Sequence, residues 1–158
     1  AVLSCIDSRT SAELVFDQGL GDIFSIRIAG NFANQDILGS MEFACNVAGS
    51  KLVVVLGHTK CGALKGGLDA PQIEGLGMDN LNHLIYHFEP CIHEVIKEGE
   101  ERSSKNEDLL ERLNVCNIKS TINDIRHQSS TLRNLEKEGK IMIVGANYDV
   151  ETGVVTWL

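Results

Sequence analysis

The chain has 158 residues, 43% of them hydrophobic, and a net charge of −8 from 14 basic and 22 acidic residues. This length suits one domain with a real core, and the hydrophobic content excludes a globally disordered chain. The acidic balance, without a basic cluster, argues against nucleic acid or an anionic membrane as the main partner, and no apolar run is long enough for this segment to insert into a bilayer.

The first half of the chain alternates short strands with helices. Residues 1–5 form an apolar strand, residues 10–18 a short helix, and residues 22–29 an alternating, β-branched second strand. Residues 37–48 place apolar side chains on one face of a helix. Residues 52–56 are apolar on both faces, as a central parallel strand covered by helices requires.

The second half is mostly helical until two final strands. The elements follow in this order: a helix over 61–68, a polar loop over 69–79, helical stretches over 81–96 and 109–125 with a charged loop between them, a short helix over 130–139, a strand over 141–145 and an antiparallel edge strand over 154–158. Pro90 kinks or restarts the helix in which it lies. Because no repeat or interdomain linker interrupts this order, we expect one α/β domain over residues 1–158.

Two short motifs follow two of these strands, about fifty residues apart: CIDSR at residues 5–9 and HTKCG at residues 58–62. In doubly wound sheets, ligands bind beyond the carboxyl ends of the strands. If the two strands are neighbours, both motifs reach one crevice. Cys5, His58 and Cys61 would then offer two thiolates and an imidazole, which suits a zinc ion with an exchangeable fourth position.

Asp7 and Arg9 project from the same turn as Cys5. A guanidinium can hold a carboxylate through two parallel hydrogen bonds. Asp7 therefore has two alternatives: it ligates the metal, or it pairs with Arg9 and accepts a hydrogen bond from a metal-bound water. Taken singly, a buried Cys is usually a core residue and an Asp-x-Arg pair a weak surface ion pair. Taken jointly, at the ends of two strands, these residues indicate a metal site.

The remaining cysteines and histidines indicate structural roles. Five cysteines, an odd number, indicate a reducing compartment with metal or free thiols in place of disulfides. Cys45, Cys91 and Cys116 lie at or near apolar helical positions, so we expect core thiols there. His83 and His87 are four apart on a helix without a third ligand, which is typical of a solvated face.

The paired motifs together resemble the signature of the β-class carbonic anhydrases. Three further stretches resemble the same family, namely RIAGN at residues 27–31, EF at residues 42–43 and IVGANYD at residues 143–149. The likeness thus runs the length of the chain. It implies a mostly parallel sheet of order 2-1-3-4 with an antiparallel C-terminal edge strand and helices on both faces. It also implies a homodimer or larger homo-oligomer with sites at subunit interfaces.

For the site, the resemblance implies one zinc ion per chain on Cys5, His58 and Cys61, and Asp7 stays a candidate for a further ligand. Asp7 and Arg9 would form the catalytic pair. The implied reaction is reversible hydration of carbon dioxide to bicarbonate and a proton by a zinc-bound hydroxide.

The resemblance also assigns a small apolar pocket for carbon dioxide. Phe24, Ala29 and Phe43 occupy the positions that line this pocket in the family. Gly62 joins them, because a glycine allows close approach of its backbone.

Two alternatives stay open. The same zinc site could hydrolyse carbonyl sulfide or carbon disulfide, which are also linear and apolar. The chain could instead be a catalytically silent regulatory zinc domain of a larger anion-transport protein. Family members usually carry N-terminal helices, and we expect this helical arm to be missing here. We expect a cytoplasmic location, unless a targeting segment is missing as well.

Overall fold

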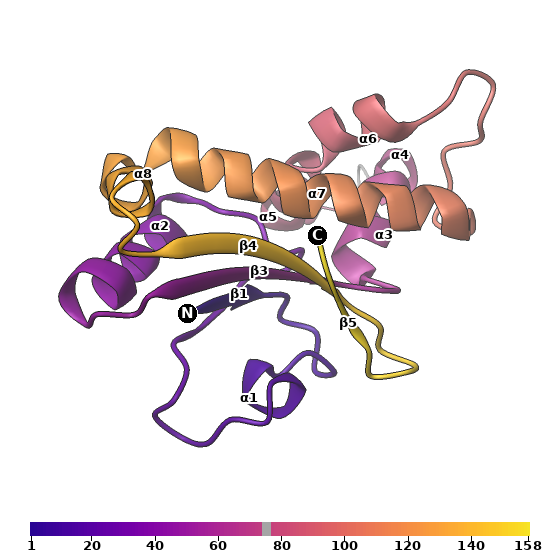
Figure 1. Cartoon of the computed structure of the whole chain (residues 1–158). Helices are drawn as coiled ribbons and strands as arrows, with labels where there is room; N and C mark the ends of the chain where they lie inside the picture. Colours follow the sequence, from indigo (N-terminus) through magenta and orange to yellow (C-terminus); the bar gives the residue numbers. More distant parts are fainter. Residues whose placement is uncertain (74–76) are drawn as a thin grey trace.

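A five-stranded sheet forms the centre of the computed structural model, which describes residues 1–73 and 77–158 (Figure 1). The strands are β1 (Val2–Ser4), β2 (Ser25–Arg27), β3 (Leu52–His58), β4 (Met142–Tyr148) and β5 (Val155–Trp157). They stand in the order β2-β1-β3-β4-β5. The first four are parallel, and β5 pairs antiparallel with β4. The predicted strand order and the antiparallel edge strand are confirmed.

β3 is the strand around which the sheet is built. Its residues from Val53 to His58 are buried, as expected for an apolar strand covered on both faces. β1 lies beside it in a register that places Ser4, the last residue of β1, next to Leu56. Both strands therefore end at the same edge of the sheet, and Cys5 emerges there close to His58.

Helices cover both faces of the sheet (Figure 1). They are α1 (Ala12–Val15), α2 (Gln35–Glu42), the π-helical turn η1 (Phe43–Val47), α3 (Gly62–Leu68), α4 (Ala70–Ile73), α5 (Asp79–Tyr86), α6 (Glu89–Val95), α7 (Glu107–Gln128) and α8 (Ser130–Lys137). α7 runs along β3 and β4, and Ala12 of α1 packs against the opposite face of the sheet. Within the described residues, no helix combines the length and apolar content that a membrane crossing requires.

Several elements differ in extent from the sequence prediction, among them α1, which covers only Ala12–Val15, and the following three. β2 is shorter than residues 22–29 because, as an edge strand, it pairs with β1 alone, which itself has three residues. The helix predicted over residues 37–48 begins earlier and ends in the π-helical turn η1. Part of the loop predicted over 69–79 is the helix α4, and residues 74–76 lie outside the described residues.

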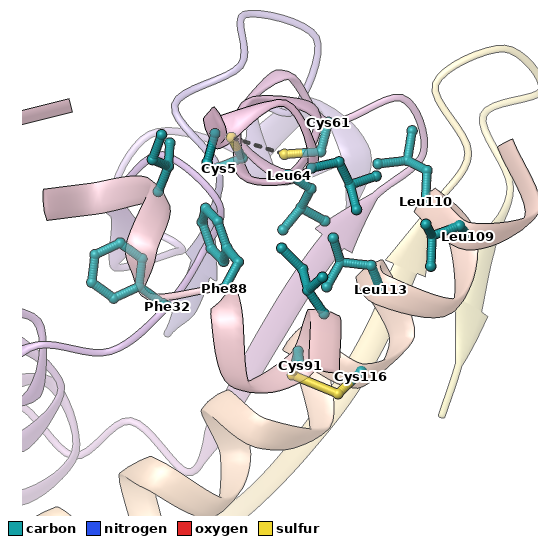
Figure 2. Close-up of a cluster of buried hydrophobic side chains, with 14 residues drawn as sticks. Cys5, Phe32, Cys61, Leu64, Phe88, Cys91, Leu109, Leu110, Leu113 and Cys116 are labelled. Atoms are coloured by element: carbon teal, nitrogen blue, oxygen red, sulfur yellow. Dashed lines mark hydrogen bonds between the residues drawn. A yellow bond between two sulfur atoms is a disulfide. The ribbon is translucent and has the colours of Figure 1, made fainter. Parts of the chain in front are cut away.

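Cys91 on α6 and Cys116 on α7 form a disulfide (Figure 2). The prediction of free thiols at these two positions is wrong, although both side chains are buried in the core as expected. Their Cα atoms lie 5.8 Å apart, within the span of a disulfide. The two residues sit on different helices, so their sequence spacing does not reveal the contact. Cys45 is a free, buried thiol, as predicted.

α7 approaches β3 and β4 at two glycines. A Cβ atom added at Gly57 would lie 2.5 Å from Ile118 Cδ1, and one at Gly145 would lie 2.7 Å from Ile118 Cγ2. Both distances are too short for a real contact. The absence of a side chain at these strand positions therefore lets the long helix pack close to the sheet.

Replacing Gly145 with Ala should lower the free energy of unfolding by about 1–3 kcal/mol, because the added methyl group overpacks the interface with Ile118. Chemical denaturation measures this change. Gly39→Ala on α2 is the control, because no atom lies within 4 Å of its Cβ position, and it should be neutral or slightly stabilising. Equal effects of the two substitutions would contradict the close approach of α7.

Candidate metal centre

Three side chains from the two predicted motifs meet at the carboxyl edge of the sheet. Cys5 follows β1, His58 ends β3, and Cys61 directly precedes α3. One ligand atom from each lies within 4.8 Å of the other two. The sulfur atoms of Cys5 and Cys61 are 3.9 Å apart (Figure 2). All three residues are at most 3% exposed, so they form a buried group of metal-binding type.

The geometry of this group fits a tetrahedral zinc ion. With Zn–S bonds of about 2.3 Å, two thiolate sulfurs at tetrahedral angles lie about 3.8 Å apart, close to the separation observed here. The Nδ1 atom of His58 is 2.9 Å from the carbonyl oxygen of Thr59, which leaves Nε2 as the ligand atom. Nε2 is buried and makes no hydrogen bond, an arrangement that a metal ion would satisfy.

The two thiols are electrostatically unequal. A hydrogen bond with Cys61 lowers the pKa of Cys5 most strongly, against the opposing effect of burial, and the backbone N–H of Gly30 lowers it further. The pKa of Cys61 is raised, first by the hydrogen bond with Cys5 and then by burial. The pair thus favours a thiolate at Cys5 with the proton on Cys61. A divalent cation in this position would take the place of that proton and hold both thiolates.

Asp7 lies beside this group and is paired with Arg9. Its carboxylate accepts hydrogen bonds from Arg9 Nε at 2.9 Å and Nη2 at 2.7 Å, and from the Arg9 backbone N–H at 3.0 Å. These bonds, the side-chain pair with Arg9 first, hold the pKa of Asp7 well below its usual range. Of the two alternatives for Asp7, this structure contains the pair with Arg9. Its role as a metal ligand stays a prediction.

Two residues that hold the turn between Cys5 and Asp7 were not found from the sequence. The Thr10 hydroxyl donates to the carbonyl oxygens of Cys5 at 3.1 Å and Asp7 at 2.9 Å. Arg27 donates to the same two oxygens at 2.9 and 2.6 Å. Arg27 comes from β2, so the strand next to β1 fixes this turn. The signals available in the sequence were a Thr five residues after a candidate ligand and the place of Arg27 in the RIAGN stretch.

The four predicted pocket residues lie in different places. Phe24 and Phe43 are exposed, meet edge to face with ring centroids 6.4 Å apart, and line a hollow between β2 and α2. This hollow shares no residue with the cavity of about 560 Å³ that contacts His58 and Cys61. Ala29 is half-buried after β2. Gly62 is exposed directly after Cys61, with no atom within 4 Å of its Cβ position.

Comparisons with known proteins agree on one family. The family model described as carbonic anhydrase matches residues 1–155. "Carbonic anhydrase 2" of Mycobacterium tuberculosis is 32% identical over 152 residues, covering 96% of this chain and 70% of that protein. "Carbon disulfide hydrolase" of Acidithiobacillus thiooxidans is 32% identical over 89 residues, but covers 51% of this chain and 41% of that protein.

Solved structures share the whole fold. The β-carbonic anhydrase CcaA superposes with a TM-score of 0.86 at 25% identity, covering 99% of this chain and 71% of that chain. A structure described as one of two tetrameric β-carbonic anhydrases from Sordaria macrospora has a TM-score of 0.84 at 20% identity, covering 99% and 78%. At 20% identity, the likeness to this second structure shows that the fold is shared and says nothing about activity or assembly.

Replacing Cys61 with Ser should abolish metal binding, because one of three ligands is lost, while the fold persists, because the sheet core does not depend on the metal. Elemental analysis after dialysis against zinc, together with circular dichroism, measures both. Cys45→Ser, which removes a buried free thiol outside the group, is the control. Unfolding of the Cys61 variant at room temperature, or zinc bound at one equivalent, would contradict this account.

Proposed function

The chain belongs to the carbonic anhydrase family, in its β-class, and on this premise we propose that it hydrates carbon dioxide reversibly to bicarbonate and a proton at one zinc ion per chain. Cys5, His58 and Cys61 would hold the ion. The observation that carries the proposal is the buried group of these three side chains, with an unpaired His58 Nε2 and a sulfur separation that fits zinc.

Zinc would supply the nucleophile, because it lowers the pKa of a bound water so that hydroxide is available near neutral pH. The thiolates of Cys5 and Cys61 bring two negative charges to the site. They offset the charge of the ion, so we expect a weaker Lewis acid than one with three neutral imidazole ligands. The site should therefore need alkaline pH for full activity.

Asp7 would act in two ways that depend on pH. Its lowered pKa keeps it ionised throughout the working range. At lower pH its carboxylate would compete for the fourth position on the metal and block turnover. At higher pH Arg9 would hold it in the bidentate pair, where it accepts a hydrogen bond from the nucleophile and orients it. The observed pairing with Arg9 supports the second arrangement.

Phe24 and Phe43 would form the apolar wall of the pocket for carbon dioxide, together with Ala29. Because both aromatic rings are exposed and lie outside the cavity at His58, we propose that they face the site of a second copy of this chain. Gly62 would leave room for substrate beside Cys61. This arrangement requires a homodimer or a larger assembly. A cytoplasmic location is our further proposal.

Hydrolysis of carbon disulfide or carbonyl sulfide is the second candidate, favoured by the partial match to a carbon disulfide hydrolase. The match covers about half of this chain, whereas the carbonic anhydrases match nearly all of it. Oxygen-isotope exchange between carbon dioxide and water tests the first candidate, and sulfide release tests the second. Zinc-replete protein without isotope exchange at any pH up to about 9, the upper end of the pKa range of zinc-bound water, would refute carbonic anhydrase activity.

Activity should rise from near nothing at acidic pH to a plateau on the alkaline side, as the Asp7 carboxylate leaves the metal. Arg9→Ala should lower the plateau strongly, because Asp7 loses its alternative partner. Asp7→Asn should weaken the loss of activity at acidic pH and should also lower the activity on the alkaline plateau. Arg126→Ala, which breaks a similar bidentate pair with Glu136 far from the motifs in sequence, is the control for Arg9. Activity that stays constant from about pH 6 to 9, a span that includes the pKa of zinc-bound water, would contradict the pH-dependent role of Asp7.

The chain should sediment as a dimer or larger species at micromolar concentration, because exposed aromatic side chains at Phe24 and Phe43 need cover.

If these side chains serve the partner's site, mixing inactive Phe24→Asp and Cys61→Ser subunits should restore activity. Random pairing would rebuild about a quarter of the wild-type sites, since half of the dimers are mixed and each has one intact site. Sedimentation at only 17.3 kDa, or no recovery on mixing, would count against this arrangement.

A further inference from the structure

The thiolate ligand Cys5 receives a hydrogen bond from the backbone of a distant turn. The N–H of Gly30 donates to Cys5 Sγ at 3.3 Å. Gly30 has a φ of +76°, and a Cβ atom there would lie 2.3 Å from the Phe88 ring. A glycine is therefore required for this peptide to sit against Phe88 with its N–H directed at the sulfur.

The same peptide turn is held from its other side by α7. Asn117, which is 4% exposed, donates from Nδ2 to the Gly30 carbonyl oxygen at 2.8 Å, across 87 residues of sequence. Burying an amide is costly unless it is hydrogen-bonded, so this contact fixes the position of α7 relative to the turn. Asn117, Gly30 and Cys5 thus form a continuous chain of contacts from the long helix to the metal centre.

We propose that Asn117 is a positioning residue of the metal centre, which holds the Gly30 N–H against Cys5 Sγ and thereby sets how strongly this thiolate donates to the metal. The inference rests on the proposed function, because it takes Cys5 as a ligand. A hydrogen bond to a thiolate draws electron density from the sulfur, so its loss makes the sulfur a stronger donor. Hydrogen bonds to a metal ligand from residues that do not touch the metal tune the donor strength of that ligand and the affinity of the site for the metal.

Cobalt(II) in place of zinc gives the test a readout besides activity. Bound thiolates produce sulfur-to-cobalt charge-transfer absorption, whose energy falls when the sulfur loses a hydrogen bond. Asn117→Ala should shift this band to longer wavelength, because the Cys5 thiolate that loses its hydrogen bond is a stronger donor. Asn114→Ala is the matched control, because Asn114 is an equally buried amide one turn earlier on α7 that donates to Asn147 Oδ1 at 2.8 Å instead.

The outcomes separate the two proposals. If the wild-type chain binds no cobalt, or binds it without thiolate absorption, the metal centre itself is wrong. If the wild type shows the band and Asn117→Ala leaves it unchanged, or if Asn114→Ala shifts it equally, the positioning role is wrong. A shift confined to the Asn117 variant supports it.

A second measurement serves if Asn117→Ala does not fold. In wild-type protein loaded with cadmium-113, the Gly30 amide proton should show a scalar coupling to the metal through its hydrogen bond to Cys5 Sγ. The milder variant Asn117→Ser, whose shorter side chain falls short of the Gly30 carbonyl, should reduce this coupling. A wild-type spectrum without the coupling, or an unchanged coupling in the Asn117→Ser variant, would overturn the inference.

Discussion

The parallel pairing of β1 with β3 is the constraint on which the site depends. Cys5 and His58 belong to motifs about fifty residues apart, and neither strand alone could bring them together. The register that sets Ser4 beside Leu56 ends both strands at one edge of the sheet. Since the carboxyl ends of parallel strands open onto the same crevice, the ligands converge without any unusual backbone conformation at either residue.

Burial of the three candidate ligands creates the electrostatic problem that the surrounding residues solve. Two adjacent thiols in a dry core resist ionisation unless hydrogen bonds or a cation compensate them. The neighbouring elements supply donors: the Gly30 N–H reaches the Cys5 sulfur, and Thr10 and Arg27 hold the carbonyl oxygens of the turn that follows. Because these donors come from β2 and the adjoining turns, the geometry of the site is a property of the whole sheet edge.

Local sequence patterns predicted much of this arrangement. The apolar run before His58 identified a central strand, and the two motifs identified all three members of the buried group, because strand ends in parallel sheets place ligands predictably. Contacts between distant elements could not be read in this way. The disulfide of Cys91 with Cys116 depends on how α6 and α7 cross, and the bond from Asn117 to the turn after β2 depends on how α7 lies on the sheet.

X-ray absorption at the zinc edge, on the zinc-loaded chain, tests the central claim most directly. The account predicts a four-coordinate ion with two sulfur ligands at about 2.3 Å and two nitrogen or oxygen ligands at about 2.0–2.2 Å, one of them an imidazole. This shell would correspond to Cys5, Cys61, His58 and one exchangeable position. A shell without sulfur, or one with three or four sulfur ligands, would contradict the assignment of this group as the catalytic metal centre.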